Sequence, residues 1–346
     1  MPTRPLFSEL TTMGVGGPAE YFVDVPDVPA LRDALSDARS QGRQVLVLGG
    51  GSNLVVSDEG FAGSVVRIGI KGCRRDNDGE LVRVEVGAGE DWASFVAQCI
   101  SEGLSGVECL SGIPGTAGAT PVQNVGAYGQ EVGQVAREVT VWDASGGSLR
   151  VMQAEECGFG YRTSVFKRHQ LEHGPVVTSV TLCLERSVLS QPLRYAELCR
   201  YMGVKLGARP PLRETAEAVL ELRRTKGMVL DANDPDTKSA GSFFTNPVLS
   251  VDQMAEFERL APGAPGFKVT GGTKVSAAWL VEHAGFDRGF EMGRAAISSK
   301  HTLAITAKPG APASDVVNLA RAVRAGVASR FGVWLEPEPV LVGLDL

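Results

Sequence analysis

Two separated segments of the sequence carry residue types suited to chemistry on a phosphorylated ligand. Residues 239–247 place one hydroxyl, Ser242, beside Gly241 and two aromatic residues, where a proton could be delivered away from water. Residues 48–54 end a short apolar stretch in three glycines, followed by Ser52 and Asn53. Glycine lets backbone N–H groups approach a phosphate closely. The two segments therefore predict a proton-transfer site and a phosphate-binding loop.

A second glycine-rich segment, residues 110–129, contains two prolines and five glycines, which exclude a helix or a central strand. A loop of this length inside a compact domain is usually functional. Two such loops suit the extended pyrophosphate of a dinucleotide, although residues 49–53 alone could form an ordinary turn between strands. No G-x-G-x-x-G sequence opens a helix, so a Rossmann nucleotide site is not supported.

Five motifs occur in a fixed order: residues 48–54, 113–129, 161–167, 240–247 and 334–338. Together they resemble the UDP-N-acetylenolpyruvoylglucosamine reductases, and the resemblance covers essentially the whole chain. It implies an α+β protein, with a two-domain FAD-binding fold of the vanillyl-alcohol-oxidase type and a third α+β domain for the substrate. The family's reaction is the NADPH-dependent reduction of UDP-N-acetylglucosamine enolpyruvate to UDP-N-acetylmuramate, a step of peptidoglycan precursor synthesis.

The resemblance also implies catalytic roles. FAD N5 gives a hydride to C3 of the enol ether, and Ser242 matches the residue that protonates C2. Arg162 matches the arginine that holds the substrate carboxylate, for which a guanidinium fork is suited. Glu338 matches the glutamate that assists enolate formation; Glu336 is the alternative, and the register of the expected strand favours Glu338. Taken singly, Ser242 could be a turn or capping serine and Arg162 a surface ion-pair partner.

Binding roles are carried over from the resemblance in the same way. The cofactor residues it implies are Gly49, Gly50, Gly51, Ser52, Asn53, Leu54, Ile113, Pro114, Gly115, Gly118, Asn124, Gly126, Ala127, Tyr128, Gly129 and Arg223. The substrate residues are Tyr161, Tyr195, Lys226, Asn246 and His301. Tyr195 lies in a segment that resembles the tyrosine loop of the family's longer class, and some members have glutamine at the position of His301. Residues 49–58 contain no histidine that could tether a flavin, so we expect non-covalent FAD.

Hydrophobic periodicity predicts the helices and strands that must position these residues. We expect a β–α–β unit over residues 1–65, strands at 81–86, 139–142 and 176–184, and a helix from Trp92 to Ile100. Further helices are expected at 211–226 and at 314–330, the latter starting with a Ser-Asp cap, followed by a final strand at 331–339. We predict FAD-binding subdomains over 1–65 and 66–210, the second including 333–346, and a substrate-binding domain over 211–332.

The composition limits the partners and the location. The 346 residues are 43% hydrophobic and 21% charged, which is ordinary for a globular protein, and the net charge of -6 comes without a basic stripe, so we expect no nucleic-acid partner. We find no apolar stretch long enough for a membrane span and no secretory signal at the start, and we expect a cytoplasmic protein. The six cysteines are expected to be reduced and buried. His169 and His173 have no third ligand nearby, so no metal is expected. The sequence does not indicate a protein partner.

Two other functions are compatible with parts of the sequence. An FAD-dependent oxidase of the same fold would explain both glycine loops, but it gives Ser242, Arg162 and Glu338 no role. A non-catalytic nucleotide-binding module would explain the loops, but neither residues 161–167 nor residues 240–247.

Overall fold

The structure is a computed structural model that describes residues 4–143, 145–168 and 174–346; His169 and His173 lie outside the described residues. Its contacts divide the chain into two compact units. The first comprises Arg4 and residues 19–51 and 62–229, and the second comprises residues 5–18, 52–61 and 230–346. The three-part division predicted from the sequence differs from these units, because residues 5–18 and 52–61 belong with the C-terminal part of the chain.

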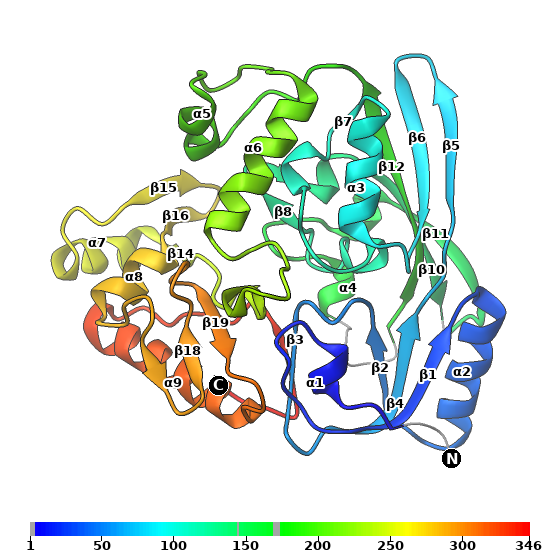
Figure 1. Ribbon diagram of the computed structural model, residues 1–346, viewed down its shortest axis with the longest axis horizontal. Coiled ribbons are helices and arrows are strands. Elements are labelled where there is room, and N and C mark those ends of the chain that lie inside the picture. The colour runs from blue at the N-terminus through cyan, green and yellow to red at the C-terminus, as the bar shows by residue number, and fades with distance from the viewer. Residues whose placement is uncertain (1–3, 144, 169–173) are drawn as a thin grey trace. The chain divides into compact units, whose positions relative to one another are not determined.

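The first unit begins with the β–α–β arrangement expected from the sequence (Figure 1). Strands β1 (Ala19–Val25), β4 (Phe61–Ile68) and β2 (Val45–Leu48) form one sheet in this order, and β2 runs parallel to β4. Helix α2 (Val28–Ser40) connects β1 to β2. It starts where the Asp27 side chain accepts a hydrogen bond from Ala30 N–H at 2.8 Å, as a capping aspartate should. The strand β2 therefore delivers the chain directly into Gly49–Gly51.

The larger sheet of this unit is antiparallel and has the order β11-β10-β12-β6-β5. Its strands are β5 (Cys73–Asp78), β6 (Leu81–Gly87), β10 (Ala136–Asp143), β11 (Ser148–Gln153) and β12 (Val176–Arg186), with the short β7 (Leu104–Ser105) beside β12. Burial alternates along β6, as its sequence predicts. One hydrophobic core joins this sheet to β1, α2 and β4 through Val25, Leu31 and Val66.

The remaining elements of the first unit are helices and short strands. They are α3 (Trp92–Ser101), η1 (Glu108–Leu110), η2 (Ala117–Ala119), β8 (Gly126–Ala127), β9 (Gln130–Glu131), η3 (Val132–Gln134), η4 (Ala154–Cys157), α4 (Val165–Arg168), α5 (Ala196–Met202) and α6 (Leu212–Thr225). The predicted helices at 92–100 and 211–226 are confirmed as α3 and α6. Both bury an apolar face, and α6 contacts η1 and α5.

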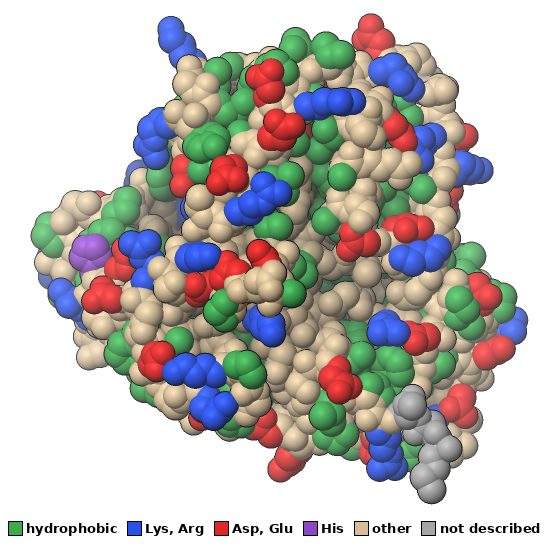
Figure 2. All heavy atoms as spheres, in the orientation of Figure 1, with side chains coloured by type: hydrophobic (Ala, Val, Ile, Leu, Met, Phe, Trp, Pro, Cys, Tyr) green, Lys and Arg blue, Asp and Glu red, His purple; other side chains and the backbone are tan. Residues whose placement is uncertain are grey.

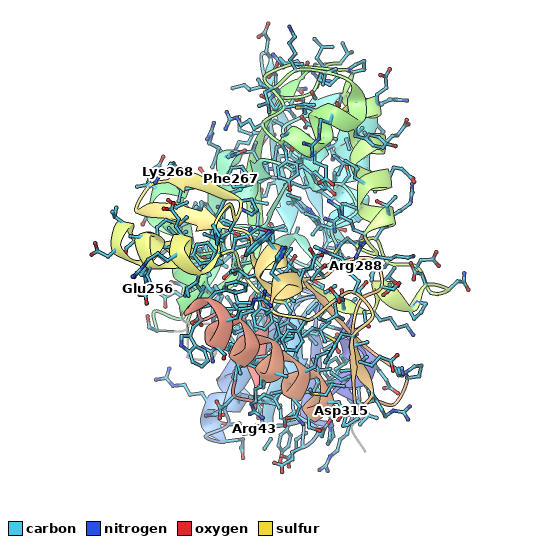
Figure 3. The ribbon with its side chains drawn as sticks, turned by 90° about the vertical axis from the view of Figure 1, so that its left-hand side faces the viewer. Arg43, Glu256, Phe267, Lys268, Arg288 and Asp315 are labelled. Atoms are coloured by element: carbon cyan, nitrogen blue, oxygen red, sulfur yellow. The ribbon has the colours of Figure 1, made fainter. Side chains whose placement is uncertain are left out.

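Among the described residues, the second unit contains two small antiparallel sheets, one parallel pair of strands and three longer helices. The sheets have the orders β13-β19-β18-β17 and β14-β16-β15, and β3 pairs in parallel with β20. The strands are β3 (Leu54–Val56), β13 (Ser239–Ser242), β14 (Val248–Leu249), β15 (Gly266–Val269), β16 (Gly272–Val275), β17 (Glu291–Met292), β18 (Ala295–Ile297), β19 (Ala304–Ala307) and β20 (Val340–Val342). The helices are α1 (Phe7–Leu10), α7 (Val251–Leu260), α8 (Ala277–His283) and α9 (Ala313–Phe331), and η5 (Pro235–Thr237) is a single turn. Phe267 and Lys268 mark the edge strand β15, and Asp315 marks α9 (Figure 3).

Two predictions for the C-terminal part were wrong. Residues 331–339 do not form a strand: Phe331 ends α9, and the terminal strand is β20, which pairs with β3 of the second unit instead of joining residues 66–210. Proline at 337 and 339 removes two N–H groups that a ladder would need. The cap of α9 does not come from its own Ser-Asp pair either. The carboxylate of Asp58 accepts hydrogen bonds from Ala313 N–H at 2.6 Å and from Ser314 N–H at 3.2 Å.

The expectation that all six cysteines are buried was also wrong in part. Cys73 is exposed and Cys183 is half-buried, whereas Cys99, Cys109, Cys157 and Cys199 are buried. Cys73 lies on β5, the edge strand of the larger sheet, where one side of the backbone faces no neighbouring strand.

Basic and acidic side chains are interspersed over the face drawn in Figure 2. Within the described ranges, no helix is both long and apolar enough to cross a membrane.

Candidate active site

The two glycine-rich loops meet backbone to backbone in the first unit. A Cβ atom added to Gly50 would lie 2.8 Å from Gly115 Cα, and one added to Gly49 would lie 2.6 Å from Thr116 Oγ1. Both distances are shorter than ordinary contacts, and at Gly50 the neighbour is backbone, so a side chain there would force the loops apart. The close approach leaves a backbone cradle that side chains would fill, which is what a bound pyrophosphate requires.

The second loop is fixed on the connection between β6 and α3. Gly118 N–H donates to Ala88 O at 2.9 Å, and Ala117 N–H donates to Glu90 O at 2.9 Å. A Cβ atom on Gly118 would lie 2.4 Å from Ala88 Cβ. The loop is therefore held in one conformation by the protein itself, which makes it a preformed binding surface.

Three residues other than glycine adopt positive φ among the described residues, and all three belong to predicted motifs. They are Asn124 at 46°, Tyr128 at 48° and Arg162 at 52°. Such conformations are uncommon and tend to cluster at functional sites. Arg162 Nη2 donates to Gly126 O at 2.8 Å, and Asn124 Nδ2 donates to Gly160 O at 3.0 Å. These bonds join residues 161–167 to the second glycine loop, so the predicted carboxylate-binding arginine is positioned by the predicted flavin loop.

Two predicted substrate residues lie together in the same unit. The rings of Tyr195 and Tyr128 meet edge to face, with centroids 5.4 Å apart, and Lys226 Nζ lies 5.6 Å from the centre of the Tyr128 ring. Tyr128 was predicted to contact the cofactor and therefore links the two groups. Burial raises the pKa of Tyr128 to about 12, so its phenol stays a neutral hydrogen-bond donor.

Arg223, near the end of α6, faces the start of the second loop. Its Nη2 donates to Met228 O at 2.7 Å and to Gly112 O at 3.5 Å. The buried Nε of Arg223 has no hydrogen-bond partner within the part of the chain that the structure describes. Burial lowers the pKa of this side chain to about 10, which leaves it charged at neutral pH. A buried cation with an unused donor suits an anionic group of a bound ligand.

Ser242 is the last residue of β13 in the second unit. An irregularity in the backbone just before it sets the direction of its side chain. The pairing of β13 with β19 shifts register between Ser239 and Ser242, and Gly241 has a φ of 75°. Such bulges re-aim a side chain, and the positive φ favours glycine. The next residue, Phe243, donates its N–H to Leu303 O at 2.7 Å and is fully buried. Phe243 and Phe244 belong to the core, so the hydroxyl is held by a rigid support.

Hydrogen bonds to backbone groups connect three of the predicted motifs near this serine. Glu338 N–H donates to Phe243 O at 2.9 Å. Asn53 Nδ2 donates to Glu338 O at 3.3 Å, and Val340 N–H donates to Asn53 O at 2.9 Å. The backbone of the predicted proton donor segment is thus bonded directly to that of the predicted acid.

The two candidate glutamates differ in exposure. The Glu336 side chain is 70% exposed, and its Oε1 lies 3.5 Å from Arg324 Nη2. Glu338 is half-buried, and its backbone is bonded both to the residue after Ser242 and to Asn53. This environment favours Glu338 over Glu336 as the glutamate with a role beside Ser242.

Comparison with known proteins gives a consistent answer along the whole chain. Residues 19–152 match the FAD binding domain family, and residues 234–342 match the C-terminal domain of UDP-N-acetylenolpyruvoylglucosamine reductase. The reductase of Thermobifida fusca is 52% identical over 348 residues, covering 98% of this chain and 97% of that protein. The reductase of Saccharopolyspora erythraea is 50% identical, covering 97% and 94%. The crystal structure of the Thermus caldophilus reductase has a TM-score of 0.67 and 30% identity, covering 98% of both chains.

This chain belongs to the UDP-N-acetylenolpyruvoylglucosamine reductase family. The match to the FAD binding domain and the likeness to the solved reductase confirm the predicted α+β fold with an FAD-binding part. The glycine cradle and the buried Arg223 fit that cofactor, since its pyrophosphate needs close backbone approach and a positive charge.

Of the other predicted substrate residues of this reductase, Tyr161 lies in the first unit, beside Arg162, and Asn246 and His301 lie in the second unit. Asn246 Oδ1 accepts a hydrogen bond from Ala277 N–H at the start of α8, at 2.8 Å, so the side chain presents its Nδ2 as a donor. His301 lies in the turn before β19, where its N–H donates to Ser298 Oγ at 3.3 Å. His301 O accepts from Ala304 N–H at 2.9 Å, and Ala304 pairs with Ser242. His301 therefore lies three residues before Ala304, the residue that pairs with Ser242 across the sheet.

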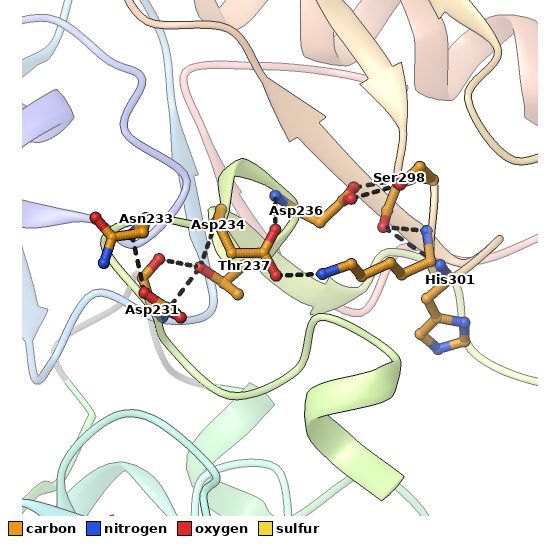
Figure 4. A network of polar contacts seen from close by, with 9 residues as sticks. Asp231, Asn233, Asp234, Asp236, Thr237, Ser298 and His301 are labelled. Atoms are coloured by element: carbon orange, nitrogen blue, oxygen red, sulfur yellow. Dashed lines mark hydrogen bonds and ion pairs between the residues drawn. The ribbon is translucent and has the colours of Figure 1, made fainter. Parts of the chain in front are cut away.

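A polar network supports the turn that carries His301 (Figure 4). Asp236 accepts from Ser299 N–H at 2.9 Å and from Ser299 Oγ–H at 2.6 Å, and Lys300 Nζ pairs with Asp234 at 2.5 Å. The imidazole of His301 points away from the carboxylates in that view. Lys300 therefore pairs with Asp234, the residue that caps η5, and the sequence did not indicate this contact.

Sequence reasoning missed two acidic residues in the first unit. Glu197 pairs with Lys226 at 2.7 Å, although it lies only two residues after Tyr195 in sequence. Glu108 is completely buried and accepts hydrogen bonds from Gly106 N–H and Gln191 N–H, both at 2.6 Å. The sequence did contain a sign that Glu108 is buried and paired: it lies between Val107 and Cys109, and a carboxylate in an apolar stretch needs hydrogen-bond partners. Glu108 anchors the segment that leads to Tyr195.

Proposed function

We propose that this chain catalyses the NADPH-dependent reduction of UDP-N-acetylglucosamine enolpyruvate to UDP-N-acetylmuramate, with non-covalent FAD as cofactor. Membership of the reductase family carries the proposal. The hydrogen bonds that join the Ser242, Asn53 and Glu338 segments support it, because they bring residues from three of the family's motifs together. Both co-substrates belong to the cytoplasm, which is where we place the reaction.

The residues that would hold FAD come mainly from the two glycine loops and Arg223. Bound there, FAD would supply the redox chemistry, through which the electrons of NADPH would reach C3 of the enolpyruvyl group as a hydride. The backbone of Gly49–Gly51 and Gly115 leaves room for the pyrophosphate, and the guanidinium of Arg223 supplies positive charge. Ser52, Asn53 and Leu54 continue the first loop into the second unit.

The substrate carboxylate and the proton transfer are assigned to three side chains. Arg162 pairs with the carboxylate and stabilises the negative charge that develops on it. Ser242 gives the proton of its hydroxyl to C2 and recovers one from solvent. Glu338 assists as an acid on the enolate oxygen. Gly241 and the fully buried Phe243 hold the serine rigidly, which favours proton delivery in one direction.

Sugar-nucleotide binding is assigned to Tyr161, Tyr195, Lys226, Asn246 and His301. Lys226 offers a point charge and Asn246 a neutral donor, and both suit a diphosphate. Tyr195 packs on Tyr128 and can cover the sugar with an aromatic edge. The substrate domain was predicted over residues 211–332, and we propose it here without residues 211–229, which belong to the first unit.

Anaerobic stopped-flow absorbance of the flavin tests the function. The enzyme is first reduced with NADPH and then mixed with the enolpyruvyl sugar. We expect rapid reoxidation on mixing in the wild type. Flavin that stays reduced until oxygen is admitted would replace the reductase assignment with the oxidase alternative.

The variant Ser242→Ala tests the proton donor in the same apparatus. We expect flavin reduction by NADPH to be nearly unchanged and the second half-reaction to slow by about 10²-fold or more, the range typical of removing a positioned general acid. Ser314→Ala is the matched control, since Ser314 is exposed in the same unit. Equal slowing of both half-reactions would show that Ser242 is structural.

A further inference from the structure

Lys226, assigned above to the diphosphate, already has an anionic partner in the protein. Its Nζ lies 2.7 Å from Glu197 Oε2, and the two side chains are 30% and 34% exposed. Lys226 caps the C-terminal end of α6, and Glu197 lies in the first turn of α5. The bond therefore ties the helix after Tyr195 to the helix that carries the predicted phosphate ligand.

Glu197 lies close to two predicted sugar-nucleotide residues of the first unit, Lys226 and Tyr195. Lys226 lies over the ring of Tyr128, and Tyr128 packs edge to face on Tyr195. After burial, the negative charge of Glu197 is among the causes that raise the pKa of Tyr195 and of Tyr128. Its field thus acts on every member of this cluster, and an incoming phosphate would experience the same field as repulsion.

Partial exposure makes the pair exchangeable. An ion pair that water reaches contributes little to stability, and a diphosphate carries more negative charge than a single carboxylate. A diphosphate can therefore take the place of the carboxylate at Lys226, but it must overcome the like charge that remains nearby.

We propose that Glu197 is a competing counter-ion, which the diphosphate of the sugar nucleotide displaces from Lys226, and that it weakens the binding of diphosphates that bring no further contacts. Glu197 is then a specificity residue: a ligand that also engages the sugar and enolpyruvyl contacts overcomes the competition, and a bare diphosphate does not. The inference rests on the proposed function, since it takes Lys226 as a diphosphate ligand.

Glu197→Gln tests the proposal in the FAD-containing full chain. Glutamine keeps the size of the side chain and an oxygen that accepts from Lys226, but it removes the charge. Isothermal titration with UDP and with inorganic pyrophosphate measures the effect. We expect both dissociation constants to fall by about three- to ten-fold, the scale of one like charge removed near a phosphate in a solvated site. The UDP effect should shrink at high salt.

Two further variants complete the test. Glu221→Gln makes the same change in net charge on α6, where Glu221 is exposed and faces Arg224, and it should leave both constants unchanged. Glu197→Asp keeps the charge and should bind UDP as the wild type does. Unchanged or weaker UDP binding by Glu197→Gln would overturn the proposal, and weaker binding would make Glu197 a positioning residue for Lys226.

The outcomes separate this inference from the proposed function. Wild-type turnover of the enolpyruvyl sugar is measured independently of UDP titration. A wild type that binds UDP but does not reduce the sugar refutes the reaction and leaves the counter-ion test valid. A wild type that reduces the sugar, combined with a charge-insensitive Glu197→Gln, refutes the counter-ion alone.

Discussion

The contact between the two glycine loops makes Gly50→Ala a sharp test of the cofactor site. The new Cβ atom would lie 2.8 Å from Gly115 Cα and 3.2 Å from Gly115 C. Both neighbours are backbone atoms, so no side chain can rotate out of the way. The loops must move apart, or the backbone must distort, before the methyl group fits.

The expected magnitude follows from the size of this overlap. Adding a methyl group to a tightly packed position typically costs about 1–3 kcal/mol. If the loops separate to relieve it, the cost appears in FAD binding as a dissociation constant raised by about five- to 150-fold. If the loops stay together, the free energy of unfolding of the apoprotein falls by the same amount. Either route gives a measurable loss.

The assay is titration of apoprotein with FAD, followed by flavin fluorescence, together with urea unfolding of the apoprotein. Gly146→Ala is the matched control in the same unit, because a Cβ atom there would meet nothing closer than Ser148 Oγ at 3.6 Å. Wild-type FAD affinity and control-like unfolding in Gly50→Ala would refute the claim that backbone approach shapes this site.

The remaining predictions concern binding, capping and thiol chemistry. Lys226→Ala should raise KM for the enolpyruvyl sugar about tenfold or more, the scale of a hydrogen bond to a charged group, whereas Lys205→Ala, on an exposed lysine of the same unit, should not; equal KM values would remove Lys226 from the site. Asp58→Ala should lower the free energy of unfolding by about 1–2 kcal/mol, because it removes the cap of α9, and an unchanged urea midpoint would contradict this role. In the folded protein at pH 8, Cys73 should account for the fast reaction with a disulfide reagent, and Cys73→Ser should abolish that phase. Burial raises the pKa of Cys99 to about 12, so its thiolate is scarce at pH 8 and becomes available only as the pH rises towards that value; a fast phase that survives Cys73→Ser would be contrary evidence.

The regular elements were predictable where the periodic pattern was strong. The alternating residues of β6 and the apolar face of α3 were recognised, because local burial alone determines such patterns. The final strand was misplaced because pairing decides which residues of an extended segment form a ladder. The strand β20 exists where β3 offers a parallel partner, and the prolines just before it cannot donate. The cap of α9 was missed because Asp58 lies 255 residues from the helix start.

The sequence by itself determined the family and the residue types at the site, because the order of the motifs along the chain can be read without knowing any distance in space. Glycine at 49, 50 and 115 stood out in two glycine-rich loops and Ser242 stood out beside a glycine and two aromatic residues, and the resemblance to the family gave them their roles. Only the tertiary structure decided which groups share an environment. It bonded Asn53 to Glu338 across 285 residues, and it gave Lys226 its partner Glu197 across 29. Hydrogen bonds and ion pairs depend on separations of about 3 Å, and the folding of the intervening chain sets those separations.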